Sequence, residues 1–498
     1  MPKHAGGALL GILDLDRSAR LPLFRQLDNQ IRQAILSGRL PLGTRLPSSR
    51  VLARDVGVSR LTVVNAFQQL IAEGFLEARR GAGSFVASGL PESLPLIPAD
   101  LGDGVQTPGR HGSRLSRRGK SLAAGADRPT PGTSPFTPNQ PAYEQFPFSK
   151  WSRLWSRCWR QPAMDMLNYG DPLGYGPLRR EIALYLADAR GVRCKPSQVI
   201  IVSGAQKAIG LAAMILLDPG DSVWMEDPGY VTMRELMRAY GARVVAVPVD
   251  RDGLDVKSGI AMAPAARMAV VTPSRQYPLG VLMSLPRRLE LLEWAQTNRA
   301  WIIEDDYDSE FRFAGRPLAS MQSLDRAGRV IYIGTFSKVL FPSLRIGYLV
   351  VPADLVDATS MACQVIDKAA PTIPQVVLAE FMAEGHFATH IRRMRSIYRE
   401  RHDVLIDASQ RYLAGLLNVR ATDSGMNVIG WLANGIDDRE AQGRARTDGI
   451  VTNRMSYYYA DAPPRSGLHL GFCNTPPAEM SRYVQKLAEG LESLTVRD

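Results

Sequence analysis

The sequence predicts an α/β protein in two parts: an N-terminal winged helix-turn-helix, and a larger domain with a mostly parallel sheet and a smaller C-terminal lobe. Two observations lead to this prediction. Residues 21–73 carry three helical patterns separated by turn residues, and residues 199–351 carry short apolar runs that are typical of buried strands. A chain of 498 residues is also long enough for two or more domains.

Charge is distributed unevenly along the chain. The net charge is +11, and residues 1–90 alone hold 12 Lys and Arg against 6 Asp and Glu. The overall composition, with 45% hydrophobic and 22% charged residues, is ordinary for a soluble globular protein. A basic first domain therefore predicts an anionic partner.

The cysteines and the apolar stretches exclude several classes of protein. Cys158, Cys194, Cys363 and Cys473 are too scattered for a metal knuckle or a disulfide framework, so we expect no metal site and buried thiols in a reducing cytosol. The first residues lack the apolar core of a signal peptide. The longest apolar stretch, 208–217, is only about ten residues and too short for a membrane span. We therefore expect a cytoplasmic protein.

Residues 21–87 carry the pattern of a winged helix-turn-helix. Apolar side chains recur at helical spacing over 21–37, Ser48 is suited to cap a second short helix, and a third helix is expected over 60–73. The runs 76–80 and 84–87 then predict a small hairpin, the wing.

The outer face of the third helix and the tip of the wing are polar. Arg60, Thr62 and Asn65 are short or forked groups able to reach base edges in a major groove. Arg79 and Arg80 suit phosphates or the minor groove. Three packed helices bind nothing in many proteins, so this pattern alone is a weak signal for DNA binding.

Residues 88–142 are dense in Pro, Gly and Ser and show no apolar periodicity, which predicts a flexible linker. Five positive charges lie between residues 110 and 120 with no acid among them. A solvated tether is one explanation of this run, and auxiliary contact with phosphates is the other. The expected domains are therefore a DNA-binding domain at 1–87, the linker at 88–142 and the large domain at 143–498.

A helix with three tryptophans is expected near the start of the large domain. Trp151, Trp155 and Trp159 stand four residues apart and should share one face of that helix. A base-stacking surface is conceivable, but an aromatic stripe at this spacing usually packs against a neighbouring domain or subunit.

The next strands end in groups that suit a phosphorylated, flat ligand. The run 199–202 reads as a buried strand, and Gly204, Ala205 and Gln206 lead from it directly into a helix. Unpaired amides at a helix start attract phosphate, and Gly204 lets a ligand approach closely. Tyr230 follows the next strand and is either a core aromatic or a ring that stacks on the ligand.

The chemistry centres on residues 301–350. The apolar run 301–303 is followed directly by the acidic cluster 304–308. The apolar run 330–334 is followed by Thr335-Phe336-Ser337-Lys338, and Arg345 comes seven residues later. Ligands of open α/β sheets bind outside the carboxyl ends of the strands, where both polar clusters fall.

These residue types fit a pyridoxal phosphate site. Lys338 can hold the cofactor aldehyde as a Schiff base, and Asp305 can face the protonated pyridine nitrogen. Tyr307 can hydrogen-bond the 3-oxygen of the ring. Hydroxyls and a guanidinium for the phosphate come from Thr335, Ser337 and Arg345. An acidic strand end and an exposed lysine would explain any one of these residues, but not the whole set in this order.

Two motif sets resemble one known family. Asp305-Asp306-Tyr307-Asp308-Ser309-Glu310-Phe311 and Gly334-Thr335-Phe336-Ser337-Lys338 resemble the signatures of MocR/GabR-type regulators. In that family a fold-type I aminotransferase-like domain follows a GntR-type DNA-binding domain. Leu46-Pro47-Ser48-Ser49-Arg50 and Gly57-Val58-Ser59-Arg60-Leu61-Thr62-Val63 resemble the GntR signature. The resemblance covers about nine tenths of the chain.

The resemblance implies partners and contacts. It implies a homodimer whose winged-helix domains pack on the partner's large domain and read a repeated or palindromic DNA site. The DNA contacts it implies are those of Ser48, Arg50, Arg60, Thr62 and the wing, and Arg45 and Ser59 are further candidates beside them.

Two positions depart from the aminotransferase pattern. Residues 273–280 resemble the loop that carries Asn-Pro-Thr-Gly in those enzymes, and Tyr277 stands in place of the ring-contacting Asn. His469 stands where a late strand should carry the arginine that clamps a substrate carboxylate, with Arg465 close by. His469 and Arg465 are therefore candidate effector-binding residues, for an effector other than an ordinary α-amino acid.

Three functions compete for this chain. The first is a transcription regulator that senses an amine, an amino acid or a B6 vitamer through pyridoxal phosphate. The second is a working aminotransferase with a DNA-binding domain, and the third is a DNA-binding protein whose large domain only dimerises. Lys338 and Asp305 count against the third, and the two departures count against the second. We therefore predict the regulator, with little or no turnover.

Overall fold

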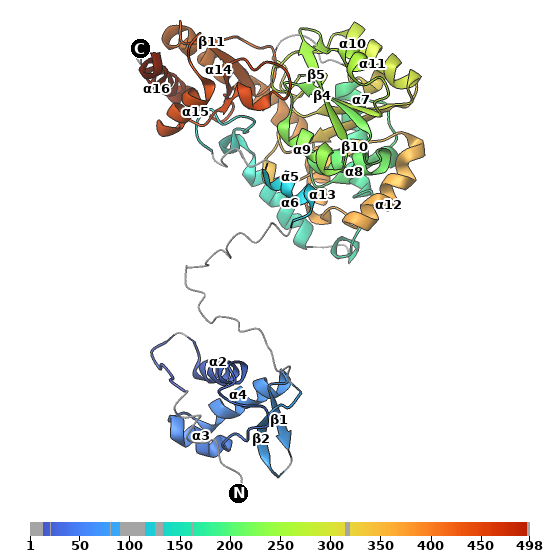
Figure 1. Cartoon of the computed structure of the whole chain (residues 1–498). Helices are drawn as coiled ribbons and strands as arrows, with labels where there is room; N and C mark the ends of the chain where they lie inside the picture. The colour runs from blue at the N-terminus through green and yellow to red at the C-terminus, as the bar shows by residue number, and fades with distance from the viewer. Residues whose placement is uncertain are drawn as a thin grey trace. The chain divides into compact units, whose positions relative to one another are not determined.

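The computed structural model describes residues 13–19, 21–79, 81–89, 115–124, 133–160, 164–313 and 319–495. The contacts divide the chain into two compact units, with the boundary between residues 112 and 113 (Figure 1). Each unit has its own hydrophobic core.

The first unit is a winged helix-turn-helix, as predicted. Its elements are the helices α2 (Leu23–Leu36), α3 (Ser49–Val56) and α4 (Arg60–Ala72) and the strands β1 (Leu76–Arg79) and β2 (Gly83–Val86). The strands pair antiparallel, with Leu76 opposite Val86 and Arg79 opposite Gly83. Leu27, Val63 and Phe67 belong to the buried core that the three helices share with the hairpin.

Capping residues fix the ends of the two short helices. The Ser48 side chain accepts a hydrogen bond from Val51 N at 3.4 Å, and Gly57 ends α3 in the left-handed conformation with φ of 71°. The Ser59 side chain accepts from Thr62 N at 3.1 Å and so begins α4. Because a serine cap satisfies an otherwise unpaired helical amide, these residues define the turn between the helices.

The second unit is built on an eight-stranded sheet in the order β3-β10-β9-β8-β7-β4-β5-β6. Pairing is parallel among five adjacent strands: β9, β8, β7, β4 and β5. Strand β10 pairs antiparallel with β3 and β9, and β6 pairs antiparallel with β5. The strands are β3 (Val199–Val202), β4 (Ser222–Asp227), β5 (Arg243–Asp250), β6 (Gly253–Leu254), β7 (Met268–Val271), β8 (Trp301–Asp306), β9 (Val330–Thr335) and β10 (Gly347–Val350). The predicted mostly parallel sheet is confirmed.

Helices cover this sheet and build the rest of the unit. They are α5 (Arg117–Ala124), α6 (Phe148–Arg160), α7 (Gly176–Arg190), α8 (Ala205–Leu216), α9 (Val231–Ala239), α10 (Val256–Met262), α11 (Leu285–Thr297), α12 (Val356–Ile366), α13 (Thr372–Ala383) and α14 (His386–Tyr412). Short 3-10 turns lie at Tyr143–Gln145, Met164–Leu167, Pro196–Gln198, Gln322–Leu324, Pro342–Leu344, Ala353–Leu355 and Met455–Tyr458.

The C-terminal lobe has a four-stranded antiparallel sheet in the order β11-β12-β14-β13. Its elements are β11 (Leu417–Val419), β12 (Asn427–Leu432), α15 (Asp438–Thr447), β13 (Asn453–Arg454), β14 (Gly467–Gly471) and α16 (Pro477–Thr495). The long helix α14 packs on α16, and α14 and α15 also contact strands of this sheet (Figure 1).

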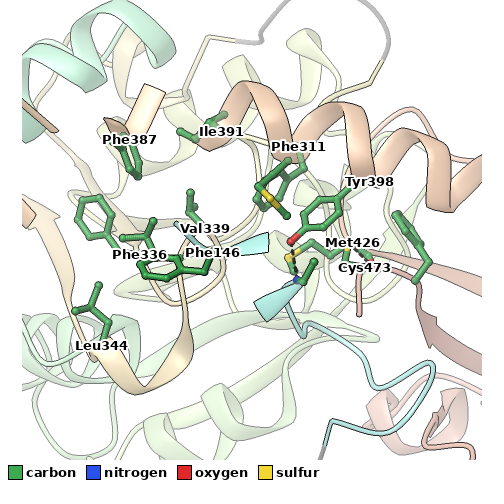
Figure 2. Packing of buried hydrophobic residues seen from close by; sticks show 14 of the residues in the cluster. Phe146, Phe311, Phe336, Val339, Leu344, Phe387, Ile391, Tyr398, Met426 and Cys473 are labelled. Atoms are coloured by element: carbon green, nitrogen blue, oxygen red, sulfur yellow. Dashed lines mark hydrogen bonds between the residues drawn. The ribbon is translucent and has the colours of Figure 1, made fainter. Parts of the chain in front are cut away.

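A hydrophobic core joins this lobe to the end of β9. Figure 2 shows Phe336 and Val339, on either side of Lys338, within the same cluster as Phe387 and Ile391 of α14. The Tyr398 hydroxyl of α14 also accepts a hydrogen bond from Ala142 N at 3.1 Å. The loop that carries Lys338 is therefore held by buried side chains on both sides.

The predicted linker ends earlier than residue 142. Residues 117–124 form α5, and Phe136 and Ala142 are buried in the core of the second unit at 0% and 2% exposure. The prediction was wrong here because Pro-rich segments lack periodicity even when they pack. Arg110 and Arg114 of the basic run lie outside the described residues.

The three tryptophans of α6 have different surroundings within this chain. The buried face of α6 carries Leu154 and Cys158, and the Trp151 ring packs edge-on against Phe341 at 5.8 Å. Trp155 and Trp159 are 36% and 48% exposed within this chain. One tryptophan of the stripe therefore packs inside its own unit, and packing of the other two against a neighbouring domain or subunit stays a prediction.

The cysteines form no disulfides. Cys158, Cys363 and Cys473 are buried, Cys194 is half-buried, and all four are unpaired. In the parts of the chain that the structure describes, the helices are too short or too polar to cross a membrane.

Candidate cofactor and effector site

The second unit contains a cavity of about 200 Å³ at the carboxyl ends of β8 and β9. All eleven side chains or backbone groups that the sequence assigned to a cofactor line it: Lys338, Asp305, Tyr307, Tyr230, Gly204, Ala205, Gln206, Thr335, Ser337, Arg345 and Tyr277. These residues come from segments up to 141 positions apart, between 204 and 345. The parallel pairing of β8 with β9 brings the acidic cluster and the lysine loop to one edge of the sheet.

Lys338 lies in the wall of this cavity. Its Nζ donates a weak hydrogen bond to the backbone oxygen of Asn139 at 3.4 Å. Burial lowers the pKa of Lys338, and the carboxylates of Asp308 and Asp305 oppose that shift. A lysine with a lowered pKa has a larger fraction of the neutral amine, which is the form that reacts with an aldehyde.

Asp305 provides the test of whether pyridoxal phosphate fits. Its Oδ1 is buried and has no hydrogen-bond partner within the described residues. Burial raises its pKa to about 7, helped by Asp306, Glu226 and Asp308. A protonated pyridine nitrogen would give this oxygen a donor and a positive charge, so the orphaned carboxylate fits the cofactor.

Two neighbouring acids, Asp306 and Glu226, have internal partners instead. Asp306 pairs with Arg190 at 2.6 Å and accepts a hydrogen bond from Tyr332 at 2.5 Å. Glu226 accepts from the Thr272 hydroxyl at 2.6 Å, and burial raises its pKa to about 7. These pairs stabilise the strand ends and leave Asp305 as the carboxylate that faces the cavity.

The opposite end of the cavity suits a phosphate. Gly204 has φ of 100° and precedes α8, whose first amides have no helical acceptor. A Cβ at Gly204 would lie 3.5 Å from the guanidinium carbon of Arg345. The Ser337 amide donates to the Thr335 hydroxyl at 3.2 Å, which holds both hydroxyls at the same wall.

Aromatic side chains form the rest of the cavity wall. The ring centroid of Tyr277 lies 5.6 Å from that of Tyr230 and 5.7 Å from that of Tyr307, both edge-on. Gln206 Nε2 donates to the Tyr230 hydroxyl at 3.2 Å and so holds that ring at the start of α9.

The two candidate effector residues lie apart. His469 of β14 is buried behind Tyr277, with its Nδ1 3.0 Å from the Tyr458 hydroxyl. Burial and the charge of Arg275 lower its pKa to about 3, so it is neutral. Arg465 stacks over the Trp431 ring at 4.2 Å and lines a different cavity of the C-terminal lobe.

Four further residues line the cofactor cavity and were not predicted from the sequence: Asn139, Met233, Thr272 and Pro342. Asn139 fell inside the predicted linker. Its position depends on paired hydrogen bonds with Asn427, 288 positions away, and no local pattern signals such a contact.

The first unit carries the predicted DNA-binding residues on its surface. Most of them are exposed, and Thr62 is half-buried. The exposed residues are Arg45, Ser48, Arg50, Ser59, Arg60, Asn65 and Arg79. Arg79 pairs with Glu77 and lies 4.6 Å over the Phe85 ring, whereas Arg80 lies outside the described residues.

Comparison with known proteins agrees with both units. Residues 23–86 match the family of bacterial regulatory proteins of the gntR type, and residues 137–487 match aminotransferase class I and II. The probable rhizopine catabolism regulatory protein MocR of Rhizobium meliloti is 41% identical over 97% of this chain and 96% of its own. The pyridoxine biosynthesis transcriptional regulator PdxR of Corynebacterium glutamicum is 30% identical over 90% of this chain and 91% of its own.

Solved aminotransferases share the fold of the second unit. The kynurenine aminotransferase of Pyrococcus horikoshii, solved with PMP, superposes with a TM-score of 0.67 at 26% identity, over 78% of this chain and 96% of that chain. The α-aminoadipate aminotransferase LysN of Thermus thermophilus, solved with N-(5'-phosphopyridoxyl)-L-leucine, gives 0.68 at 28% identity, over 76% and 99%.

The relatives match both units in one chain. The cavity offers the amine of Lys338, the Asp305 carboxylate oxygen that has no hydrogen-bond partner, and an end suited to a phosphate group. This protein belongs to the MocR/GabR type of GntR-family transcriptional regulators, whose aminotransferase-like domain takes pyridoxal phosphate as cofactor.

Proposed function

We propose that this regulator senses a small primary amine, an amino acid or a B6 vitamer at the Lys338 cavity and changes its DNA binding in response. Bound pyridoxal phosphate supplies an aldehyde that condenses with primary amines. The observation that carries the proposal is that Lys338 and the orphaned Asp305 carboxylate face one cavity, in a chain that also carries a winged helix.

The chain's own residues have separate tasks in this proposal. Lys338 holds the aldehyde, Asp305 keeps a proton on the pyridine nitrogen, and Tyr307 hydrogen-bonds the 3-oxygen. Tyr230 and Tyr277 exclude water from the ring. Backbone amides at 204–206 and the side chains of Thr335, Ser337 and Arg345 bind the phosphate.

For the DNA-binding unit, we propose that α4 enters a major groove with Arg60, Thr62 and Asn65 at the base edges. Arg79 and the rest of the wing contact the backbone or the minor groove. Exposure of these side chains on one small basic unit supports this assignment.

We also propose a cytoplasmic homodimer in which each winged-helix domain packs on the partner's large domain. Trp155 and Trp159 of α6 are large aromatic side chains that remain exposed in the single chain, which supports an interface at that helix. Two DNA-binding domains would then read two half-sites.

The competing function is an aminotransferase with a DNA-binding domain, and turnover separates the two. Transamination needs a substrate held with its α-carbon bond perpendicular to the cofactor ring, usually through a clamped carboxylate. His469 is neutral and lies behind Tyr277, so this clamp is lacking among the described residues of that wall.

We therefore expect slow turnover when the cofactor-loaded protein is assayed with a panel of amino donors and a keto acid. A rate of about 1 per second or faster, the low end of ordinary enzymes, would reject the sensor in favour of the enzyme. A slower rate accompanied by binding of the amine donor supports the sensor.

A further inference from the structure

Asn139 holds an unusual backbone conformation at the cofactor cavity. Its φ is 61°, in the left-handed region where Asn is among the few tolerated side chains. Its amide donates to Asn427 Oδ1 at 2.7 Å, and Asn427 Nδ2 donates back to its Oδ1 at 2.8 Å. Asn139 is therefore anchored to β12 while its carbonyl oxygen contacts Lys338 Nζ.

From Asn139 a chain of hydrogen bonds runs into the C-terminal lobe. Asn139 Nδ2 donates to the Tyr277 hydroxyl at 3.1 Å, which lies 3.1 Å from the Tyr458 hydroxyl. The Tyr458 hydroxyl lies 3.0 Å from His469 Nδ1 and accepts from Asn453 Nδ2 at 2.9 Å. His469 is neutral, and in the tautomer with its proton on Nε2 its Nδ1 accepts from Tyr458, so that the hydrogen bonds run in one direction from Asn139 to His469.

In the described ranges, this end of the cavity carries no arginine for a carboxylate, and its one lysine, Lys338, is the amine that holds the cofactor aldehyde in the proposed function. Among the described residues that line the cavity, the cations are Lys338 and Arg345, and Arg345 lies at the Gly204 turn. Arg275 lies behind this wall, where it donates to Thr422 Oγ1 and Asn427 O. A carboxylate bound against Asn139 and Tyr277 would lose its hydration without gaining the paired hydrogen bonds of an arginine, which is costly.

Hydrogen-bonding capacity remains on this wall. Asn139 uses one hydrogen of Nδ2 and one lone pair of Oδ1 in the bonds above, and the Tyr277 oxygen retains a lone pair. The wall therefore offers one donor and two acceptors to a ligand. A hydroxyl both donates and accepts, so it matches this set, whereas a carboxylate only accepts.

We infer that Asn139 and Tyr277, backed by Tyr458 and His469, form a subsite for an uncharged hydroxyl-bearing group, and that the effector is a hydroxylated primary amine. This inference rests on the proposed amine-sensing function and names its ligand class. Asn139 is then a specificity-determining residue.

The test compares three amines with one carbon skeleton on the full chain loaded with pyridoxal phosphate. They are isopropylamine, 2-amino-1,3-propanediol (serinol) and L-alanine. Beside the amine, isopropylamine carries no polar group, serinol carries two hydroxyls and L-alanine carries one carboxylate. Affinity is measured by calorimetry, and the change in visible absorbance is recorded on the same samples. We expect serinol to bind at least tenfold more tightly than either of the others.

Two variants test whether Asn139 determines the preference for serinol. Asn139→Gly keeps the left-handed conformation but removes the amide, so we expect about a tenfold loss for serinol and less than a twofold change for isopropylamine. Arg299→Gly is the matched control, since Arg299 also has a positive φ of 51° and lies exposed outside the cavity lining. It should leave all three affinities unchanged.

The outcomes separate the inference from the function on which it rests. Equal or tighter binding of L-alanine, or an equal loss for all amines in Asn139→Gly, would overturn the hydroxyl subsite while amine sensing stands. If none of the three amines gives heat or an absorbance change, the amine-sensing function itself fails and the subsite fails with it.

Discussion

Replacing Lys338 by alanine is expected to abolish the visible absorbance band of the cofactor-loaded protein and the trapping of a pyridoxyl adduct by borohydride. The physical reason is that Lys338 carries the amine of the cavity that can hold the aldehyde covalently. Its Nζ makes one weak hydrogen bond, to Asn139 O, so the fold should survive the change. Absorbance spectra and peptide mapping after reduction provide the measurement.

Asp305→Asn is the matched comparison for this variant. It should keep the covalent attachment to Lys338 but weaken the band or shift it to shorter wavelength, because the pyridine nitrogen loses its counter-ion. An adduct found on another lysine of the wild-type protein would refute the assignment of Lys338.

Arg60→Ala is expected to reduce the preference for specific over random DNA by roughly 1 to 3 kcal/mol. This corresponds to a factor of about five to one hundred and fifty, since roughly 1.4 kcal/mol is tenfold. Arg60 begins α4, and its guanidinium makes one long hydrogen bond, 3.5 Å to Ser49 Oγ, so it can turn to a base. Fluorescence anisotropy with both DNAs measures the ratio.

Arg79→Ala serves as the comparison for a phosphate contact. It should weaken binding to both DNAs alike and flatten the dependence on salt, because fewer counter-ions are released. An equal loss on specific and random DNA from Arg60→Ala would mean that α4 is not the recognition helix.

The sequence predicted those features whose chemistry is local. Asp305 and Lys338 each follow an apolar run, so their place at strand ends could be inferred from the order of residues alone. Ser48 and Ser59 cap the helices that they were expected to cap or precede. In each case the determining interactions lie within a few positions along the chain.

Features that depend on distant contacts escaped prediction. Phe136 and Asn139 lie in a Pro-rich segment whose order comes from partners such as Asn427. Strand β5, at Arg243–Asp250, was also missed, although its central residues are buried. His469 was noted as a departure, but its bond to Tyr458 depends on how the C-terminal lobe packs.

The acidic strand ends also give the cofactor a structural role. Asp305 and Asp308 are buried with pKa values raised to about 7, and Asp308 has Arg275 as its counter-ion at 3.6 Å. A cationic ring beside Asp305 would offset this burial. We therefore expect the bound cofactor to raise the stability of the second unit.

The most direct test of the account is the DNA affinity of the full-length protein in three states: without cofactor, loaded with pyridoxal phosphate, and loaded with an added amine. The DNA is a fragment that the protein itself selects from random sequence, and the Lys338→Ala variant is measured in parallel. The account predicts dissociation constants that differ more than twofold among the three states, and no response to the amine in Lys338→Ala. Identical binding curves in all three states would contradict it.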